Sequence, residues 1–280
     1  GSYLLKVDLY YQVAAYSREE TINTYTTIVQ VAAGFCSETE VTLNSLTDFY
    51  TITYMVDDQE ITTFKGSNVI TTTFKKNSNV ELPIAYNDGQ LSIGWFNDPE
   101  CKDPVELNTD NKFTITENIT LYSQWGSEVS GEVLSFGTID TENTIEGLLI
   151  YNETGLNYFR DIVNGTLTGN IIVSDNVVYR SGKAYPTVNA KLCDDIELTE
   201  DNWVPIGNLT NCYQGIFDGN GKCVTNLKIN SNTSTDLGFF GCVQDATIKN
   251  LYVQGNINCN SSYNIGGIVG QANNSVTIKN

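Results

Sequence analysis

Histidine is absent from this chain of 280 residues. Its absence excludes Ser-His-Asp triads, Cys-His nucleophile pairs and HExxH zinc motifs, because each of these needs an imidazole. The seven cysteines contain no CxxC pair, and an all-cysteine zinc site is built from such short spacings. The sequence therefore predicts no catalytic residue of these classes, no metal site and no cofactor.

Basic residues are scarce, with 15 Lys and Arg against 33 Asp and Glu, and the formal net charge is −18. A field of this sign repels phosphate, which argues against nucleic acid and anionic membrane surfaces as partners. No apolar run is long enough to insert across a bilayer, and no signal peptide is recognisable. Only 17% of the residues are charged, while Thr, Asn, Ser and Tyr are abundant. This composition indicates a β-rich protein with a polar surface.

The order of sequence patterns predicts four segments. Alternating apolar and polar residues predict an N-terminal β-module at 1–46 and a second β-module at 47–126. A connector with strand character follows at 127–150, and a C-terminal module occupies 151–280.

One helix is predicted, at residues 153–164. It has an apolar stripe of Leu156, Phe159, Ile162 and Val163, and Gly165 follows as a stop signal.

The C-terminal module contains a repeat. The segment 237–241, Leu-Gly-Phe-Phe-Gly, returns as Ile-Gly-Gly-Ile-Val-Gly at 265–270, with an offset of 28 from Gly238 to Gly266. Ile248 returns as Ile278, 30 residues later. Such repeats are typical of a stacked β-solenoid, in which the predicted helix would cover one open end. The residues predicted to point inward are Val224, Leu227, Ile229, Ile248, Leu251 and Val253. Because the chain stops on a repeat element, we expect it to be part of a longer protein.

The Gly residues of these repeats, with the sequence Gly-Ile-Phe-Asp-Gly-Asn-Gly at 215–221, resemble the GLUG motif of bacterial and protist surface proteins. The stretches at 194–198 and 203–207 match the entry into its first coils, so the resemblance covers residues 151–280. It implies a right-handed parallel β-helix scaffold on a cell surface and no particular activity.

A second resemblance covers about residues 50–126. Gly-Trp-Phe-Asn-Asp at 94–98 and Asn-Ile-Thr-Leu-Tyr-Ser-Gln-Trp at 118–125 are similar to the Listeria–Bacteroides repeat, the B-repeat of internalins. The resemblance implies a β-grasp-like module of the kind that forms stalks in surface adhesins. Trp95 and Trp125 are predicted to be core aromatics, with a sugar-binding platform as the alternative. Cys101 departs from the family pattern, and its pairing with Cys36 is left open.

The cysteines and the glycosylation sequons both favour an extracellular protein. The conservative interpretation is that the cysteines form structural disulfides, and the alternative is that they are buried free thiols. Five candidates for bridges lie in the C-terminal module: Cys193, Cys212, Cys223, Cys242 and Cys259. Seven Asn-x-Ser/Thr sequons are candidate N-glycosylation sites. They begin at Asn118, Asn152, Asn164, Asn208, Asn232, Asn260 and Asn273.

These patterns predict an all-β, non-enzymatic, extracellular surface protein with a structural or adhesive role. It would contact a protein or glycan ligand through a solenoid face or a strand edge, or associate with itself into a filament. For the filament, the strand from Tyr3 to Val13 is the predicted donor for strand exchange between subunits.

The alternative hypothesis is a carbohydrate-active β-helix enzyme that uses paired carboxylates. The candidates are Asp194, Asp195, Glu197 and Asp218, although solvated turn carboxylates are the more conservative interpretation. Asp218 does not begin an EF-hand, because the twelfth position of such a loop would be Ile229 rather than Glu.

Overall fold

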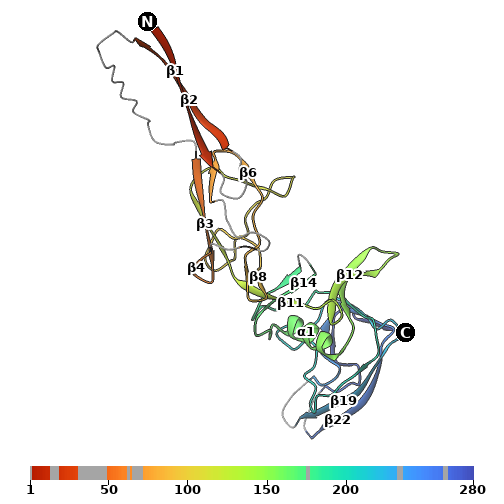
Figure 1. The fold of residues 1–280 in the computed structure, drawn as a ribbon. Helices are drawn as coiled ribbons and strands as arrows, with labels where there is room; N and C mark the ends of the chain where they lie inside the picture. The colour runs from red at the N-terminus through yellow and green to blue at the C-terminus, as the bar shows by residue number, and fades with distance from the viewer. Residues whose placement is uncertain are drawn as a thin grey trace. The chain divides into compact units, whose positions relative to one another are not determined.

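The computed structural model describes residues 2–12, 19–30, 49–61, 64, 72–174, 177–231, 236–260 and 264–280, and it describes 2–12 and 19–30 by their backbone alone. The chain divides into two compact units, Gly1–Trp125 and Gly126–Asn280. The described residues are mostly in β-strands, with one α-helix (Figure 1). No helix among them is long and apolar enough to cross a membrane.

The first unit begins with a long antiparallel hairpin of β1 (Ser2–Gln12) and β2 (Glu19–Gln30), in which Ser2 pairs with Gln30. The strand predicted as a donor is therefore already paired within its own chain. The segment that follows, including Cys36, lies outside the described residues.

The core of the first unit is built around β3 (Phe49–Val56). It pairs in parallel with β10 (Ile119–Ser123) and antiparallel with β4 (Gln59–Glu60) and β5 (Thr73–Lys75). Ile52, Tyr54 and Val56 are buried, as the alternation of the strand requires. The short strands β6 (Asn79–Val80) and β9 (Phe113–Thr114) form a separate antiparallel pair.

Aromatic packing in this unit confirms the prediction for Trp95, whose ring lies 4.9 Å from that of Tyr54 and whose indole nitrogen donates to the carbonyl of Pro83. Trp125 is half-buried and packs against the same cluster. A hairpin joins β7 (Tyr86–Asn87) to β8 (Gln90–Ser92) through Asp88 and Gly89, both at positive φ, as a two-residue turn requires. Neither tryptophan is an exposed platform for sugars.

The second unit opens with β11 (Trp125–Val129), whose residues Gly126 to Val129 pair in parallel with β14 (Asn170–Val173). On its other edge β14 pairs antiparallel with β15 (Val177–Tyr179). The segment predicted as a connector contains a hairpin of β12 (Leu134–Asp140) and β13 (Ile145–Ile150).

The helix α1 (Glu153–Asn164) confirms the predicted bounds and buries the predicted apolar stripe. Asn152 caps its first turn, because the Asn152 side chain accepts a hydrogen bond from the Gly155 amide. Gly165 ends it with φ of 75°.

The rest of the second unit consists of strands that pair in chain order. The strands β16 (Ala190–Leu192), β18 (Ile216–Asp218), β21 (Thr247–Lys249) and β24 (Thr277–Lys279) follow one another in parallel and extend from β13. The resulting six-stranded sheet is mixed, because β12 and β13 are antiparallel.

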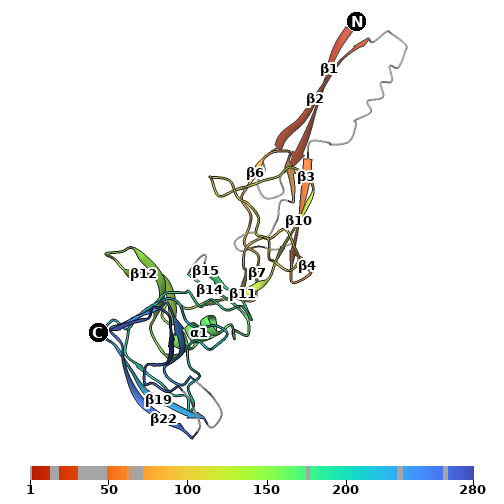
Figure 2. The same cartoon turned by 180° about the vertical axis from the view of Figure 1, so that it is seen from behind.

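Two further sheets have the same parallel order. One contains β17 (Ile196–Glu197), β19 (Cys223–Ser231) and β22 (Tyr252–Cys259), and the other contains β20 (Phe240–Gln244) and β23 (Val269–Asn273). The strands β19 and β22 lie side by side in both views (Figures 1 and 2).

The predicted inward residues form the core between these sheets. Val224, Leu227, Ile229, Ile248 and Leu251 are all buried, and Val253 is half-buried. Val224 and Leu227 are three residues apart on β19, so two inward residues of this strand depart from strict alternation. Asn226, at φ of 61°, lies where the register shifts, and this bulge turns both Val224 and Leu227 inward.

Successive strands are also tied by asparagine and aspartate side chains. Asp195 accepts from the Cys223 amide at 2.8 Å, and Asn226 donates to the Leu198 carbonyl at 2.5 Å. Glycine is needed at position 238 for close packing of the backbone and not for a positive φ. An added Cβ would lie 2.7 Å from the Gly266 carbonyl oxygen.

Cys212 and Cys242, which are 30 residues apart, form a disulfide between neighbouring strand levels. The thiols of Cys193, Cys223 and Cys259 are free.

Candidate ligand-binding groove

A groove of about 720 Å3 lies in the second unit, between the end of α1, the segment 202–210 and the end of β19. Its walls combine amide, hydroxyl and aliphatic groups. The residues that line it are Asn164, Thr166, Asn202, Trp203, Val204, Pro205, Gly207, Asn208, Leu209, Thr210, Ile229, Asn230, Ser231, Asp236 and Leu237.

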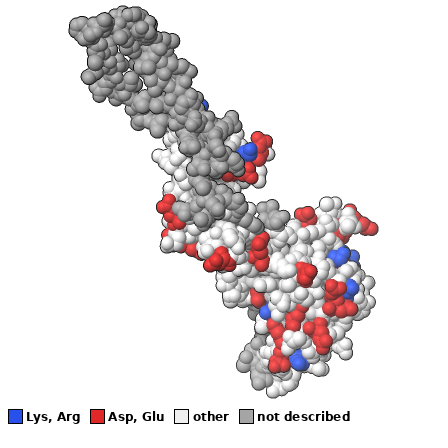
Figure 3. All heavy atoms as spheres, viewed as in Figure 1, with Lys and Arg blue, Asp and Glu red and all other residues white. Residues whose placement is uncertain are grey.

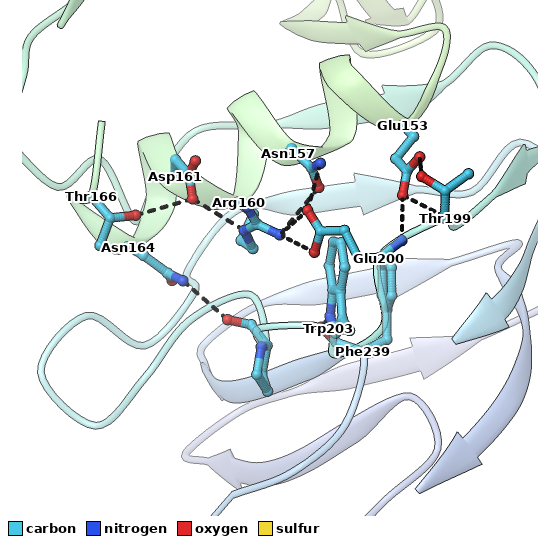
Figure 4. A network of polar contacts seen from close by, with 11 residues as sticks. Glu153, Asn157, Arg160, Asp161, Asn164, Thr166, Thr199, Glu200, Trp203 and Phe239 are labelled. Carbon is cyan, nitrogen blue, oxygen red and sulfur yellow. Dashed lines mark hydrogen bonds and ion pairs between the residues drawn. The ribbon is translucent and has the colours of Figure 1, made fainter. Parts of the chain in front are cut away.

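A polar network ties α1 to residues 199–200, which come shortly before the groove residues Asn202 and Trp203 in the chain (Figure 4). Arg160, with a side-chain exposure of 11%, pairs with Glu200 at 3.1 Å, and Asn157 donates to the same carboxylate at 2.8 Å. Glu153 accepts from the amide and the hydroxyl of Thr199. Burial alone would raise the pKa of Glu153, but these hydrogen bonds lower it below its ordinary value.

Trp203 anchors the segment that follows. Its side chain is buried, stacks on Phe239 at 5.3 Å with an interplanar angle of 5°, and donates to the Phe239 carbonyl. The guanidinium of Arg160 lies 5.1 Å from the centre of its ring. Because Trp203 is committed to the core in this way, it sets the position of the exposed residue after it, Val204.

Asn164 holds the base of the groove. Its side-chain nitrogen donates to the Pro205 carbonyl at 3.0 Å, and its side-chain oxygen accepts from the Gly207 amide at 2.7 Å. Asn211 donates to the Asn164 main-chain carbonyl. Asn164 is 7% exposed, so this sequon lies in the interior of the folded unit.

Exposed amides and aliphatic groups form the open part of the groove. Asn202 accepts from the Asn230 backbone amide at 2.7 Å, and Asn230 is in register with Asn258 on the next strand. Val204 and Leu209 are 53% and 64% exposed. The groove therefore offers uncharged hydrogen-bonding groups beside apolar surface.

The charge inside the groove is low. Among its described lining residues, Asp236 alone is ionisable; it is buried and accepts from Asn264 at 2.6 Å. On the face drawn in Figure 3, Asp and Glu side chains are scattered over the second unit, with fewer Lys and Arg among them. Within the described residues, no group of His, Cys, Asp and Glu is arranged to hold a metal ion.

The carboxylates considered for catalysis lie outside this groove. Asp194, Asp195 and Glu197 are exposed around β17. Asp218 is buried, accepts from Asn250 and lies 3.4 Å from the ammonium of Lys249.

Lys249 also pairs with Asp140 at 3.4 Å. Burial alone would lower the pKa of Lys249, but Asp218 and Asp140 together raise it. This cluster ties the β12–β13 hairpin to β18 and β21.

The sequons occupy different environments. Asn118, Asn208 and Asn260 are exposed, whereas Asn152 caps α1 and Asn273 lies 3.5 Å from the sulfur of Cys242. Asn232 lies outside the described residues.

Sequence reasoning missed the groove. The recurrence of Asn at positions 202, 230 and 258, at intervals of 28, is the signal that could have pointed to it.

Comparison with known proteins adds no relative. No protein-family model matches the chain, and no curated protein or solved structure has significant similarity to it.

Proposed function

We propose that this chain belongs to an extracellular surface protein with a structural and adhesive role. In this proposal the second unit is a right-handed parallel β-solenoid with α1 as its cap. The first unit carries a β-grasp-like module similar to the internalin B-repeat. The parallel strand order and the 28- and 30-residue register offsets support the solenoid assignment.

The disulfide between Cys212 and Cys242 is the observation that carries the extracellular assignment. Disulfides persist in oxidising compartments and are rare in the reducing cytosol. The composition is rich in uncharged polar residues, which is compatible with a solvated surface domain. The net charge is negative and gives no support to nucleic acid or anionic membranes as partners.

The test is mild protease treatment of intact source cells, followed by mass spectrometry of the released peptides. We expect peptides of this chain in the released fraction, with Cys212 joined to Cys242 before reduction. A cytoplasmic protein, used as a control for lysis, should be absent from that fraction. Recovery of the chain only from broken cells, with both cysteines reduced, would refute the proposal.

Self-association into a filament is a second part of this proposal. The hairpin of β1 and β2 carries outer strand edges, and a strand edge is a template for pairing with another chain. Deleting residues 1–13 removes β1 and should abolish filaments in electron micrographs. Filaments that persist after this deletion would rule out the hairpin as the contact.

The alternative of a carbohydrate-active enzyme gains no specific support. Asp218 is engaged by Lys249 and Asn250, and the other candidate carboxylates do not line the groove.

A further inference from the structure

We propose that the groove beside α1 binds a neutral oligosaccharide. Asn230 and Asn202 would supply the hydrogen-bonding amides, and Val204 and Leu209 the apolar contacts. This inference rests on the proposed adhesive function and specifies the chemical class of its ligand.

The charge of the groove selects a neutral ligand. Lys and Arg do not occur among the described residues that line it, so an anionic ligand would find no counter-charge from them in a chain that is already strongly acidic. Its one carboxylate, on Asp236, is buried and hydrogen-bonded to Asn264. A cationic ligand therefore has no exposed carboxylate to pair with among the groove residues that the structure describes.

The hydrogen-bonding groups match sugar hydroxyls. An Asn amide offers donors and an acceptor, and a Thr hydroxyl both donates and accepts, as a sugar hydroxyl does. The side chains of Asn230 and Asn202 are exposed, and Asn230 makes no side-chain hydrogen bond within the described part of the chain. The C–H faces of a sugar ring can pack on Val204 and Leu209, which expose apolar surface at the same place.

The backbone around the groove argues against an extended peptide as the ligand. A peptide that adds a strand needs unpaired backbone groups at a sheet edge. At the end of β19, the Lys228 carbonyl accepts from the Trp203 amide at 2.7 Å, and the Asn230 amide donates to Asn202. The side of β19 that faces the groove is thus already satisfied.

The groove is also held in shape before any ligand arrives. Asn164 fixes Pro205 and Gly207, and Trp203 is fixed by Phe239 and Arg160. A preformed site loses little conformational entropy on binding, which matters for ligands that make few strong contacts.

The spacing of the amides favours a polymer over a single sugar. Asn230 and Asn258 are register partners on adjacent parallel strands, which places their backbones about 4.8 Å apart. Asn202 lies one level before them and is bonded to Asn230. Asn202 and Asn230 line the groove, and Asn258 continues their row beyond it, so a chain of sugars that extends past the groove can contact successive amides.

The experiment is isothermal titration calorimetry of the full oxidised chain, produced without glycosylation, against cellohexaose, chitohexaose, mannohexaose and xylohexaose. Polygalacturonate and a lysine-rich peptide serve as charged probes. We expect at least one neutral oligosaccharide to bind, with an affinity that does not change between low and high salt.

Two variants locate the site. Asn230→Ala removes an exposed amide and should weaken binding about tenfold, the loss of one good hydrogen bond. Asn256→Ala, a matched change of an exposed Asn on β22 outside the groove, should leave binding unchanged. Because both positions are exposed, both variants should fold and keep the disulfide.

Equal binding by Asn230→Ala, binding of only the charged probes, or binding of none of the neutral oligosaccharides would overturn the inference. Failure of this binding experiment can be told apart from failure of the protease test on intact cells. A chain that is released from intact cells but binds no neutral sugar loses this inference alone. A chain that binds sugar but stays inside cells loses the surface assignment.

Discussion

Removing the disulfide should destabilise the second unit by a predictable amount. The bridge closes a loop with a sequence separation of 30 between Cys212 and Cys242. In the chain-entropy description, closing a loop of that size lowers the entropy of the unfolded chain, and this stabilises the folded state by about 3.6 kcal/mol at 25 °C. The double variant Cys212→Ala, Cys242→Ala leaves two methyl groups at buried positions and adds no new polar atom.

The assay is a urea titration read by pulsed hydrogen exchange and mass spectrometry, with peptides from β16 to β22 as the reporters of the second unit. With a urea dependence of about 1–3 kcal/mol per molar, the midpoint should fall by about 1–4 M. The reduced parent chain should show the same shift, and Cys193→Ala, which removes a free thiol, should show none. A midpoint that stays within error of the oxidised parent would refute the entropic reasoning.

Three further predictions concern single side chains. Tyr213→Phe should raise the unfolding free energy by about 1 kcal/mol in the same titration, because its hydroxyl is buried without a partner among the described residues. The lowered pKa of Glu153 means that its stabilising contribution is present above the unfolded pKa, about 4.3, and is lost as pH falls through the folded value. Glu153→Gln should therefore flatten the loss of stability as the pH falls below the unfolded pKa, and an unchanged pH profile would contradict the role of the contacts from Thr199. In a eukaryotic secretory host, Asn208 should accept an N-glycan and Asn164 should not, because only Asn208 is exposed. Peptide mapping after deglycosylation in heavy-oxygen water decides this, and occupancy at Asn164 in folded protein would contradict the burial argument.

Local patterns in the sequence predicted the elements that depend on local chemistry. The helix α1 follows from one apolar stripe and a glycine stop, and both signals lie within a few residues of each other. The inward residues of β19 and β21 were predicted as the apolar positions of short stacked strands, and they are buried.

The cysteine pairing needed the register, which the sequence did not reveal. Cys193 and Cys223 are also 30 residues apart, yet their thiols stay free. Near them the strands pair with an offset of 28, because Ile196 faces Val224, and so Cys193 is out of step with Cys223. At the bridge the offset is 30, because Tyr213 faces Val243. A change of two residues in local register thus decides which cysteines meet.

The groove was not predicted, for a related reason. Its residues come from α1, from an irregular segment and from the end of β19, and they meet only because Trp203 and Asn164 fix that segment. No short-range pattern encodes such a meeting of distant parts.

The bridge between Cys212 and Cys242 also has a consequence for extension under force. A pull on the two ends of the chain would peel strands away level by level, but the covalent link bypasses every residue between the two cysteines. That segment would contribute about 100 Å of contour length if it could be drawn out, at roughly 3.3–3.6 Å per residue. While the disulfide is intact, a stretching force cannot extend this segment, and a reducing agent would release its length as one discrete step.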